Sequence, residues 1–405
     1  MKDYRYIYII MALLIPTAAS VVSPIMALYL TDKLHLSTSL ISLYYVILPI
    51  FMVVTTQIAG KISDMGFNRS RIIAISASFG VIANAFFFYI PSVWLLSLVV
   101  VPCFSLAQVG YSQIFASARE YGIKHLKSSI NFTTTLRALA SLSWVMGPPV
   151  AYFLVVNISY ESLFVSCGVL YFIAALMSYL MPKVEKEKHS SESQKGEILH
   201  NKSVIFLFIS VMVMFTSFTG YASTIPLYIT HELKLPEELP GYVYSLAAFL
   251  EIPIMFLAAR LSKRIGLKKI MVAGGITLFI FMVMLPLTTR PLMFMLIAIL
   301  PAFFIATVNA MGMVYFQELL PNIPGQATSL FLNACVSGQV VGGALIGIAD
   351  NNHYSPIYMV DAVLAAIGLL FLIAVKKPKE IRYDNFLLVS AFYFVAVCII
   401  LIVLF

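Results

Sequence analysis

The sequence predicts an all-α integral membrane protein. Of its 405 residues, 61% are hydrophobic and only 11% are charged, whereas a soluble domain carries about 25% charged residues. Apolar runs long enough to cross a bilayer as helices recur along the whole chain. A transmembrane β-barrel would instead show alternating segments of roughly ten residues. We therefore expect a multi-pass protein embedded in a lipid bilayer.

The apolar runs fall into two groups of six, followed by one more. Between the groups, residues 182–202 form the longest hydrophilic segment, which is typical of a flexible cytoplasmic linker. We expect an N-terminal six-helix bundle (1–181), this linker, a C-terminal six-helix bundle (203–375), and a basic loop with an extra, thirteenth helix (376–405). The predicted spans are 6–30, 38–60, 71–90, 93–116, 130–156, 161–181, 203–229, 240–259, 269–288, 291–317, 326–348, 355–375 and 385–405.

The positive charges lie almost entirely on one side of these spans. Only Lys33, Lys234 and Arg290 fall in loops on the other side, and Arg137 falls within a span. By the positive-inside rule, the N-terminus is cytoplasmic. The net charge of +8 is thus explained by cytoplasmic loops, and we expect no nucleic-acid partner.

The sequence offers no candidates for catalysis, metal binding or a cofactor. The four cysteines lie in apolar segments without a CxxC pair, and the histidines fall in or beside loops. No G-x-x-x-x-G-K-[ST] loop is present for an NTP-driven pump. A membrane-embedded enzyme or assembly factor is a remote alternative, because the outer acids Glu232, Glu237 and Glu238 lack a metal-like arrangement.

Arg137 and Glu251 are two charges within predicted spans. Arg137 lies nine residues beyond Ser128, about 13–14 Å at helical rise, and Glu251 lies eleven beyond Pro240, about 16 Å. Both are therefore near the midplane, where a charge costs at least a few kcal/mol. We hypothesise that they pair across the two halves, and that protonating Glu251 frees Arg137 to bind substrate. A static structural pair is the alternative.

Other polar residues are candidate ligands. Trp144 is seven residues from Arg137 on the same helix face, and an arginine beside an indole suits a polyhydroxylated ligand. We add Gln108, Tyr244, Asn309 and Asn333, although each could instead join helices without touching a ligand. Asp361, about 9 Å into the last core span, is expected to reach water. A stripe of small residues predicts close helix packing: Gly338, Gly342, Gly343 and Gly347.

The loop between the second and third spans resembles a signature of the major facilitator superfamily. Its pattern is G-x-x-x-D-x-x-G with basic residues following, here Gly60, Asp64, Arg69 and Arg71. Gly60 would let two helices approach closely, and Asp64 would pair with basic residues or cap a helix. The resemblance implies a conformational latch. Gly66 departs from the pattern by standing one place early.

Longer segments resemble the sugar efflux transporters of that superfamily. They include Leu142 to Pro149, Leu250 to Met255 and Gly312 to Leu319, together with the segments around Arg137. The resemblance implies the major facilitator fold, with two six-helix bundles around a central cavity in a bacterial cytoplasmic membrane. It implies alternating access and export of a sugar or small glycoside, coupled to protons. A proton-coupled drug exporter of the same fold is the alternative.

Overall fold

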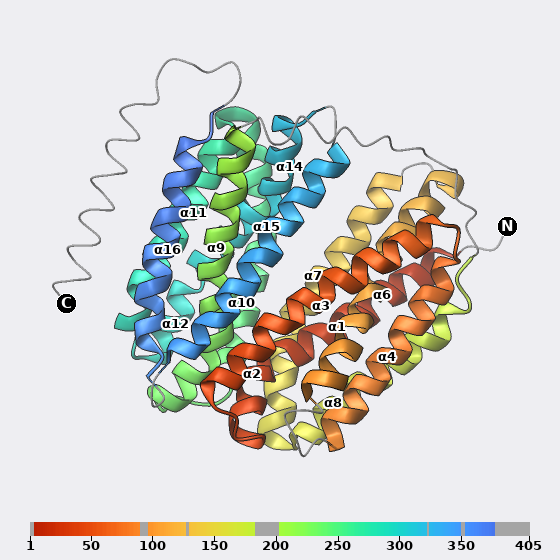
Figure 1. Ribbon diagram of the computed structural model, residues 1–405, viewed down its shortest axis with the longest axis horizontal. Coiled ribbons are helices and arrows are strands. Elements are labelled where there is room, and N and C mark those ends of the chain that lie inside the picture. The colour runs from red at the N-terminus through yellow and green to blue at the C-terminus, as the bar shows by residue number, and fades with distance from the viewer. Residues whose placement is uncertain are drawn as a thin grey trace. The chain divides into compact units, whose positions relative to one another are not determined.

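The structure is a computed structural model that describes residues 4–89, 96–126, 129–182, 202–321, 324–349 and 353–376 (Figure 1). Within these ranges, twelve helices are long and apolar enough to cross a membrane. They divide into two compact units, residues 1–190 with 237–245 and residues 191–236 with 246–405. The predicted helix 385–405 and most of the linker lie outside the described residues, so they stay predictions.

The first unit contains the first six spans. The first of them continues from α1 through a 3-10 turn, a short helix and a π-turn, whereas the others are mostly single helices. Their bounds are α1 (Arg5–Val22), η1 (Ser23–Ile25), α2 (Met26–Leu28), η2 (Tyr29–Lys33), α3 (Thr38–Asp64), α4 (Arg69–Tyr89), η3 (Leu96–Val100), α6 (Val101–His125), α7 (Ser129–Asn157) and α8 (Tyr160–Ser178).

The second unit contains the other six spans, and its tenth span is divided into four segments. The bounds are α9 (Lys202–Leu227), η4 (Tyr228–Glu232), α10 (Leu239–Ile265), α11 (Leu267–Met284), η5 (Leu285–Leu287), α12 (Pro291–Ile297), α13 (Ile299–Phe304), η6 (Ile305–Asn309), α14 (Ala310–Leu319), α15 (Pro324–Ala344), η7 (Leu345–Ile348) and α16 (Ser355–Ala374). The first turns of α10 group with the first unit and the rest with the second.

Aromatic side chains fill the core of the first unit. In this unit α1 packs against α6, α7 and α8, and α4 packs between α6 and α8. Tyr29 donates a hydrogen bond to the carbonyl of Phe87 (2.7 Å), and Phe87 stacks on Phe164 with 4.7 Å between ring centroids. The contact satisfies a buried hydroxyl while burying two apolar rings, so it holds the first, third and sixth spans together.

Small residues bring the helices of the second unit together. Here α9 packs between α15 and α16. A Cβ added to Gly338 or Gly342 of α15 would lie 2.4 Å from a backbone carbonyl of α9. On the other side, Ser210 donates a hydrogen bond to the carbonyl of Gly368 (2.7 Å) in α16. The close packing expected at Gly338 and Gly342 is confirmed, because only glycine fits there.

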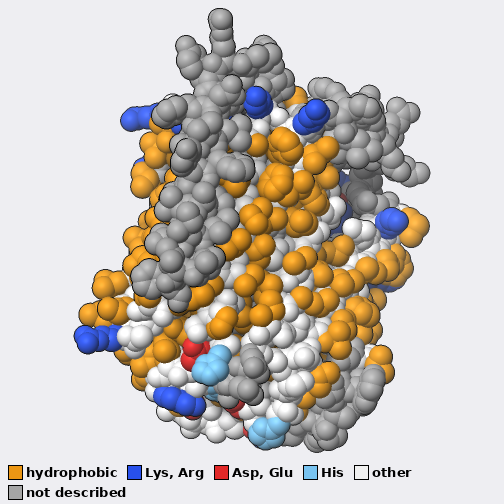
Figure 2. Space-filling model, turned by 60° about the vertical axis from the view of Figure 1, so that its left-hand side comes forward, with side chains coloured by type: hydrophobic (Ala, Val, Ile, Leu, Met, Phe, Trp, Pro, Cys, Tyr) orange, Lys and Arg blue, Asp and Glu red, His pale blue; other side chains and the backbone are white. Residues whose placement is uncertain are grey.

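The surface suits a lipid environment. Figure 2 shows one face, on which hydrophobic side chains cover the middle while charged and histidine side chains gather toward the two ends. Many large apolar side chains are exposed, among them Phe153, Phe172 and Phe249. Apolar exposure of this extent marks a membrane-facing surface.

Candidate functional site

Arg137 lies on an exposed face of α7. It interacts electrostatically with Tyr111 of the neighbouring helix α6, and Tyr111 is 40% exposed. The Tyr111 ring also meets Phe115 edge-on, with 4.9 Å between centroids. A guanidinium beside an exposed phenol offers several donors and an aromatic surface to an oxygen-rich ligand.

The buried face of α7 determines which residues this helix exposes. Ser143 receives a hydrogen bond from Thr17 of α1 (3.0 Å), and Ser20 of α1 donates to the Ser143 carbonyl (2.8 Å). One turn further, a Cβ on Gly147 would lie 2.2 Å from the Ser20 hydroxyl. Close approach of α7 to α1 at Gly147 therefore fixes the rotation of α7, and this rotation leaves Arg137 exposed.

The other predicted ligand residues of the first unit keep some exposed surface. Gln108 is half-buried on α6, one turn before Tyr111, and Trp144 is 44% exposed on α7. Among the described residues, no hydrogen bond or ring contact joins Trp144 to Arg137. Arg137 and Tyr111 therefore lie on neighbouring helices and interact electrostatically, while the predicted pairing of guanidinium and indole stays a prediction.

The first turns of α10 pack against α7. Ser245 donates a hydrogen bond to the carbonyl of Val145 (2.6 Å). A Cβ on Gly241 would lie 2.7 Å from the ring of Tyr152. Tyr244 stands between these two contacts in the sequence and is half-buried. This candidate is therefore held close to the helix that carries Arg137.

The predicted residues of the second unit lie on three spans. Glu251 is half-buried on α10, which is the least buried of the twelve spans. Within its own unit, no described residue forms a hydrogen bond or ion pair with the Glu251 carboxylate. Asn309, at the end of the π-turn η6, and Asn333 of α15 are both exposed. All three side chains are accessible to a ligand or to a proton.

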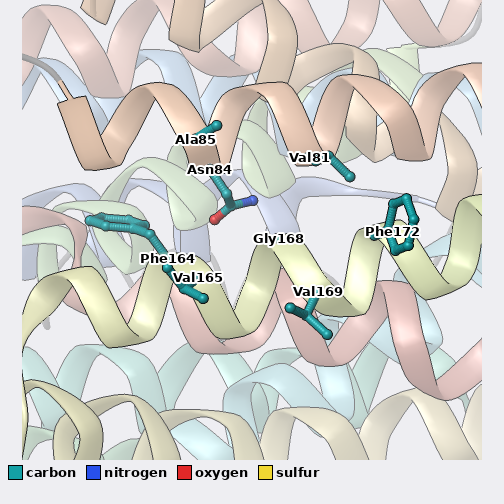
Figure 3. A pocket seen from close by; sticks show the side chains of 8 residues that line it. All are labelled: Val81, Asn84, Ala85, Phe164, Val165, Gly168, Val169 and Phe172. Atoms are coloured by element: carbon teal, nitrogen blue, oxygen red, sulfur yellow. The ribbon is translucent and has the colours of Figure 1, made fainter.

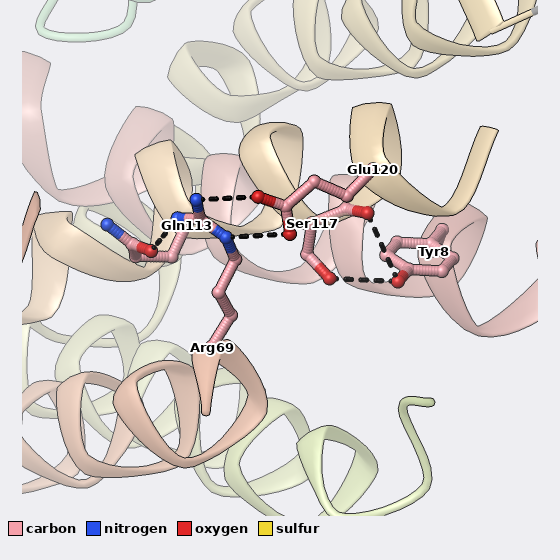
Figure 4. Close-up of polar contacts among 5 residues, drawn as sticks. All are labelled: Tyr8, Arg69, Gln113, Ser117 and Glu120. Atoms are coloured by element: carbon pink, nitrogen blue, oxygen red, sulfur yellow. Dashed lines mark hydrogen bonds and ion pairs between the residues drawn. The ribbon is translucent and has the colours of Figure 1, made fainter. Parts of the chain in front are cut away.

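A charged network fastens α4 to α6 (Figure 4). Arg69 donates to both carboxylate oxygens of Glu120 (3.0 and 2.8 Å) and to the side-chain oxygen of Gln113 (2.7 Å). The Arg69 and Glu120 side chains are only 15% and 20% exposed. Nearby, the hydroxyls of Tyr8 and Ser117 are hydrogen-bonded at 2.8 Å. These contacts join α1, α4 and α6 near the start of α1 and α4 and the end of α6.

Sequence reasoning missed the partners of Arg69. A usable signal was present, because Gln113, Ser117 and Glu120 follow one another at intervals of four and three residues on α6. That spacing places them on one helix face. Sequence alone did not indicate which basic residue would meet this face.

The structure contradicts one other part of the predicted latch and leaves a second part a prediction. A Cβ on Gly60 would meet nothing within 4 Å, so the expected close helix approach at Gly60 is wrong for this structure. Asp64 is the last residue of α3, and its side chain lies outside the described part of the chain. Gly66 has φ +95°, a conformation that suits glycine, and thus makes the turn despite its shifted position. Arg71 is exposed.

A pocket between α4 and α8 is a poor match for a polar substrate (Figure 3). Its volume is about 390 Å³, and Asn84 supplies the only polar side chain. The other lining residues are Val81, Ala85, Phe164, Val165, Gly168, Val169 and Phe172. None of the predicted site residues lines it, so we assign the candidate site to the Arg137 region instead.

Asp361 differs from its prediction. The expectation that it reaches water is wrong, because the side chain is 0% exposed and lies against α9 at Gly220. Glycine leaves room there that any larger residue would fill. Among the described residues, no group of three or more His, Cys, Asp or Glu could hold a metal ion.

Comparisons with known proteins agree with this architecture. The family model described as Major Facilitator Superfamily matches residues 8–216 and, a second time, residues 207–405. Sugar efflux transporter A of Dickeya chrysanthemi is 30% identical over 89% of this chain and 93% of its own length. Sugar efflux transporter B of Salmonella typhimurium is 27% identical over 91% of this chain and 94% of its own. Among solved structures, the nucleoside transporter NupG has a TM-score of 0.80 at 15% identity, covering 93% of this chain and 100% of that one.

The chain is therefore a multi-pass membrane transporter of the major facilitator superfamily, and not an enzyme. Within that superfamily it belongs to the sugar efflux transporters, since the similarity at 30% identity spans nearly the whole of both chains.

Proposed function

We propose that this protein exports sugars or small glycosides from the bacterial cytoplasm in exchange for protons. The observation that carries the proposal is the position of Arg137 on the open face of α7, beside Tyr111 and one helix away from Gln108. A sugar presents many hydroxyls on a compact body, and a guanidinium offers five donors in a fixed arrangement. The names of the relatives support the same substrate class.

Arg137 binds the substrate oxygens in this proposal, and Gln108, Tyr244, Asn309 and Asn333 supply further hydrogen bonds. Trp144 packs its indole on the C–H faces of the sugar ring. A lipophilic drug would need a mainly apolar pocket instead. Because Arg137 is costly to keep in a membrane, its retention on an exposed face favours an oxygen-rich substrate over a drug.

Glu251 carries the proton in this proposal. It is the half-buried carboxylate of α10 and has no polar partner within its own unit among the described residues. A proton from the outer side binds Glu251 and frees Arg137 for substrate. Glu251 then releases that proton to the cytoplasm once the sugar is bound, and release of the sugar outside allows the two opposite charges to attract each other again. Proton entry is thereby linked to sugar exit through alternating access.

The lysines and arginines support the orientation of the protein. By the positive-inside rule, their distribution supports a position of the N-terminus and the Arg69–Glu120 network on the cytoplasmic side of the bacterial plasma membrane. Opening and closing of the cytoplasmic side would then involve Gly60, Asp64, Arg69 and Arg71.

The proposal is tested with inside-out membrane vesicles that contain the full chain. Labelled lactose, glucose, a thiogalactoside and a cationic drug are offered with and without a pH gradient, acidic inside. We expect gradient-dependent uptake of at least one sugar and none of the drug. Uptake of the drug alone would assign the protein to drug export. Uptake of a sugar that is unaffected by the gradient would show that export is not coupled to protons.

A further inference from the structure

Asp361 is a carboxyl group buried within the second unit without a partner. It lies six residues after the start of α16, about 9 Å along the helix, and its side chain is 0% exposed. Neither of its carboxylate oxygens has a hydrogen-bond partner among the described residues. The hydroxyls of Ser217 and Tyr221 on the adjacent helix α9 are also buried and unpartnered.

The Asp361 carboxyl points at one face of α9. A Cβ on Gly220 would lie 2.6 Å from each of its two oxygens. Ser217, Gly220, Tyr221 and Thr224 share this face, because they are spaced three, one and three residues apart along the helix. Hydroxyl groups therefore stand on either side of the glycine that the carboxyl touches.

Tyr358 links the two helices at the same level. Its hydroxyl receives a hydrogen bond from the Thr224 hydroxyl (3.3 Å). It also interacts electrostatically with Asp361, Tyr221 and Tyr228. Asp361 thus belongs to a buried cluster of hydroxyls contributed by α9, η4 and α16.

Among the described residues, no positively charged side chain is hydrogen-bonded or ion-paired to this carboxyl. Tyr358 interacts electrostatically with this carboxyl, and Tyr221 and Tyr228 in turn interact with Tyr358. The lysine of α11, Lys268, donates instead to the carbonyls of Ile373 and Val375 at the far end of α16. The turns η5 and η7 contain no titratable residue.

A negative charge does lie toward the near end of α16. There, the Glu232 carboxylate accepts hydrogen bonds from the backbone N–H groups of Tyr354 and Ser355. The sign of this charge does not compensate an ionised Asp361.

An unpaired carboxylate in such a place is strongly destabilising, because it has lost its hydration and gained no partner. Binding one proton removes that charge and turns one oxygen into a donor, for which the free hydroxyl oxygens are acceptors. We propose that Asp361 is a proton-binding site buried within the C-terminal bundle, with the Ser217 and Tyr221 hydroxyls as its hydrogen-bonding partners. The proton comes from water and returns to water, so no other reactant is needed.

The site would also couple the proton to helix packing. Gly220 contacts Asp361 on one side, and its backbone nitrogen lies 3.2 Å from where a Cβ of Gly342 in α15 would stand. Ionisation of Asp361 would place a charge beside a close contact between α9 and α15. We expect α16 to separate from α9, or water to enter, when the proton leaves.

Infrared spectroscopy of the purified full-length protein tests the site directly. The carbonyl stretch of a protonated carboxyl, recognised by its shift in D₂O, is recorded at pH 7 for the wild type, Glu251→Gln, Asp361→Asn and the double variant. We expect one such band to persist in Glu251→Gln and to be absent from Asp361→Asn and from the double variant. Glu161→Gln, at a carboxylate paired with Lys33 (2.9 Å), is the matched control and should leave the band unchanged.

A band that survives Asp361→Asn unchanged in the Glu251→Gln background overturns the proposal. Should Asp361→Asn fail to fold, Ser217→Ala and Tyr221→Phe keep the carboxyl and remove its hydroxyl partners. At least one of these variants must then shift the frequency of the band; if neither does, the proposal is wrong. These readouts need no transport, so they succeed or fail independently of the proposed sugar export.

Sodium is the other small cation that could neutralise the carboxyl. Melting temperatures of the wild type and Asp361→Asn are compared from pH 6 to pH 10, in sodium chloride and in choline chloride. In the folded protein Asp361 holds a proton that the unfolded chain has already released in this pH range. Raising the pH therefore favours unfolding, and we expect the wild type to lose more stability than the variant as the pH rises. Stabilisation of the wild type by sodium, but not of Asp361→Asn, would replace the proton assignment with a sodium site.

Discussion

The two halves of this transporter use the same backbone turn but fasten it differently. After the second span of each half, a glycine adopts a positive φ: Gly66 at +95° in the first half and Gly266 at +90° in the second. In the first half, Arg69 follows the turn and donates two hydrogen bonds to the Glu120 carboxylate of α6. In the second half, Lys268 donates instead to two backbone carbonyls at the end of α16 (2.9 and 2.7 Å).

The difference teaches that the backbone plan is shared between the halves while the charges are not. The first half joins the start of α4 to the end of α6 with a bidentate ion pair and exposes Arg137 on α7. The second half caps a helix end with a lysine, half-buries Glu251 and fully buries Asp361. We infer that the halves perform different tasks, with substrate binding centred in the first and proton binding in the second.

The largest expected effect is that of Arg137→Gln. Loss of two charge-assisted hydrogen bonds, at about 1.5–3 kcal/mol each, should reduce both gradient-driven export and sugar counterflow by on the order of 100-fold or more. The measurement is labelled-sugar flux in proteoliposomes, with Arg260→Gln, an exposed arginine of α10, as the control. Normal counterflow by Arg137→Gln would show that substrate binding is not centred in the first half.

Glu251→Gln should separate the two tasks. With no proton to exchange, export driven by a pH gradient should fall to background, at least about tenfold, while counterflow of sugar persists. Glu237→Gln, at an exposed acid before α10, should change neither rate. Gradient-driven export that survives in Glu251→Gln shows that this residue is not the proton carrier.

The Arg69–Glu120 ion pair of the first half should contribute more to the unfolding free energy than the Lys268 cap of the second half. Arg69→Ala leaves a partly buried carboxylate without its partner, and we expect a loss of about 2–4 kcal/mol in unfolding free energy. Arg69→Lys should recover only part of this loss, since an ammonium cannot make the bidentate contact. Denaturant unfolding of Arg69→Ala, Glu120→Gln and the double variant gives the coupling energy. A coupling near zero would mean that the network is incidental.

The smallest expected effect is that of Lys268→Met. The lysine caps a helix C-terminus in a partly exposed place, so its removal should cost about 0.3–1 kcal/mol. The same unfolding measurement applies, with Lys269→Met, at an exposed neighbour, as the control. A loss of unfolding free energy as large as that of Arg69→Ala would show that the two fastenings stabilise their halves equally.

Most of the fold could be predicted from the sequence. Each of the twelve core spans contains a helix, because apolar length and the sidedness of Lys and Arg fix the number and order of the crossings. The interruptions could not be predicted. The tenth span, expected as one helix from 291 to 317, contains the π-turn η6, which depends on local backbone strain and leaves no clear pattern of residues.

The candidate site was only partly predictable. Spacing along one helix predicts that Arg137 and Trp144 share one side of α7, because they are seven residues apart, and both side chains are exposed. Contacts between helices could not be read from spacing. The Arg69 partners on α6, the open space at Gly60 and the burial of Asp361 all depend on which helix packs against which.

The second half is closed on itself at both membrane surfaces. At one end Glu232 caps α16, and at the other the hydroxyl of Ser203 and the backbone of Lys376 exchange hydrogen bonds. Hydrogen bonds thus connect the first and last spans of this half at both of their ends. A gene divided within the linker should therefore yield a second fragment that assembles in the membrane alone and rejoins a separately expressed first fragment.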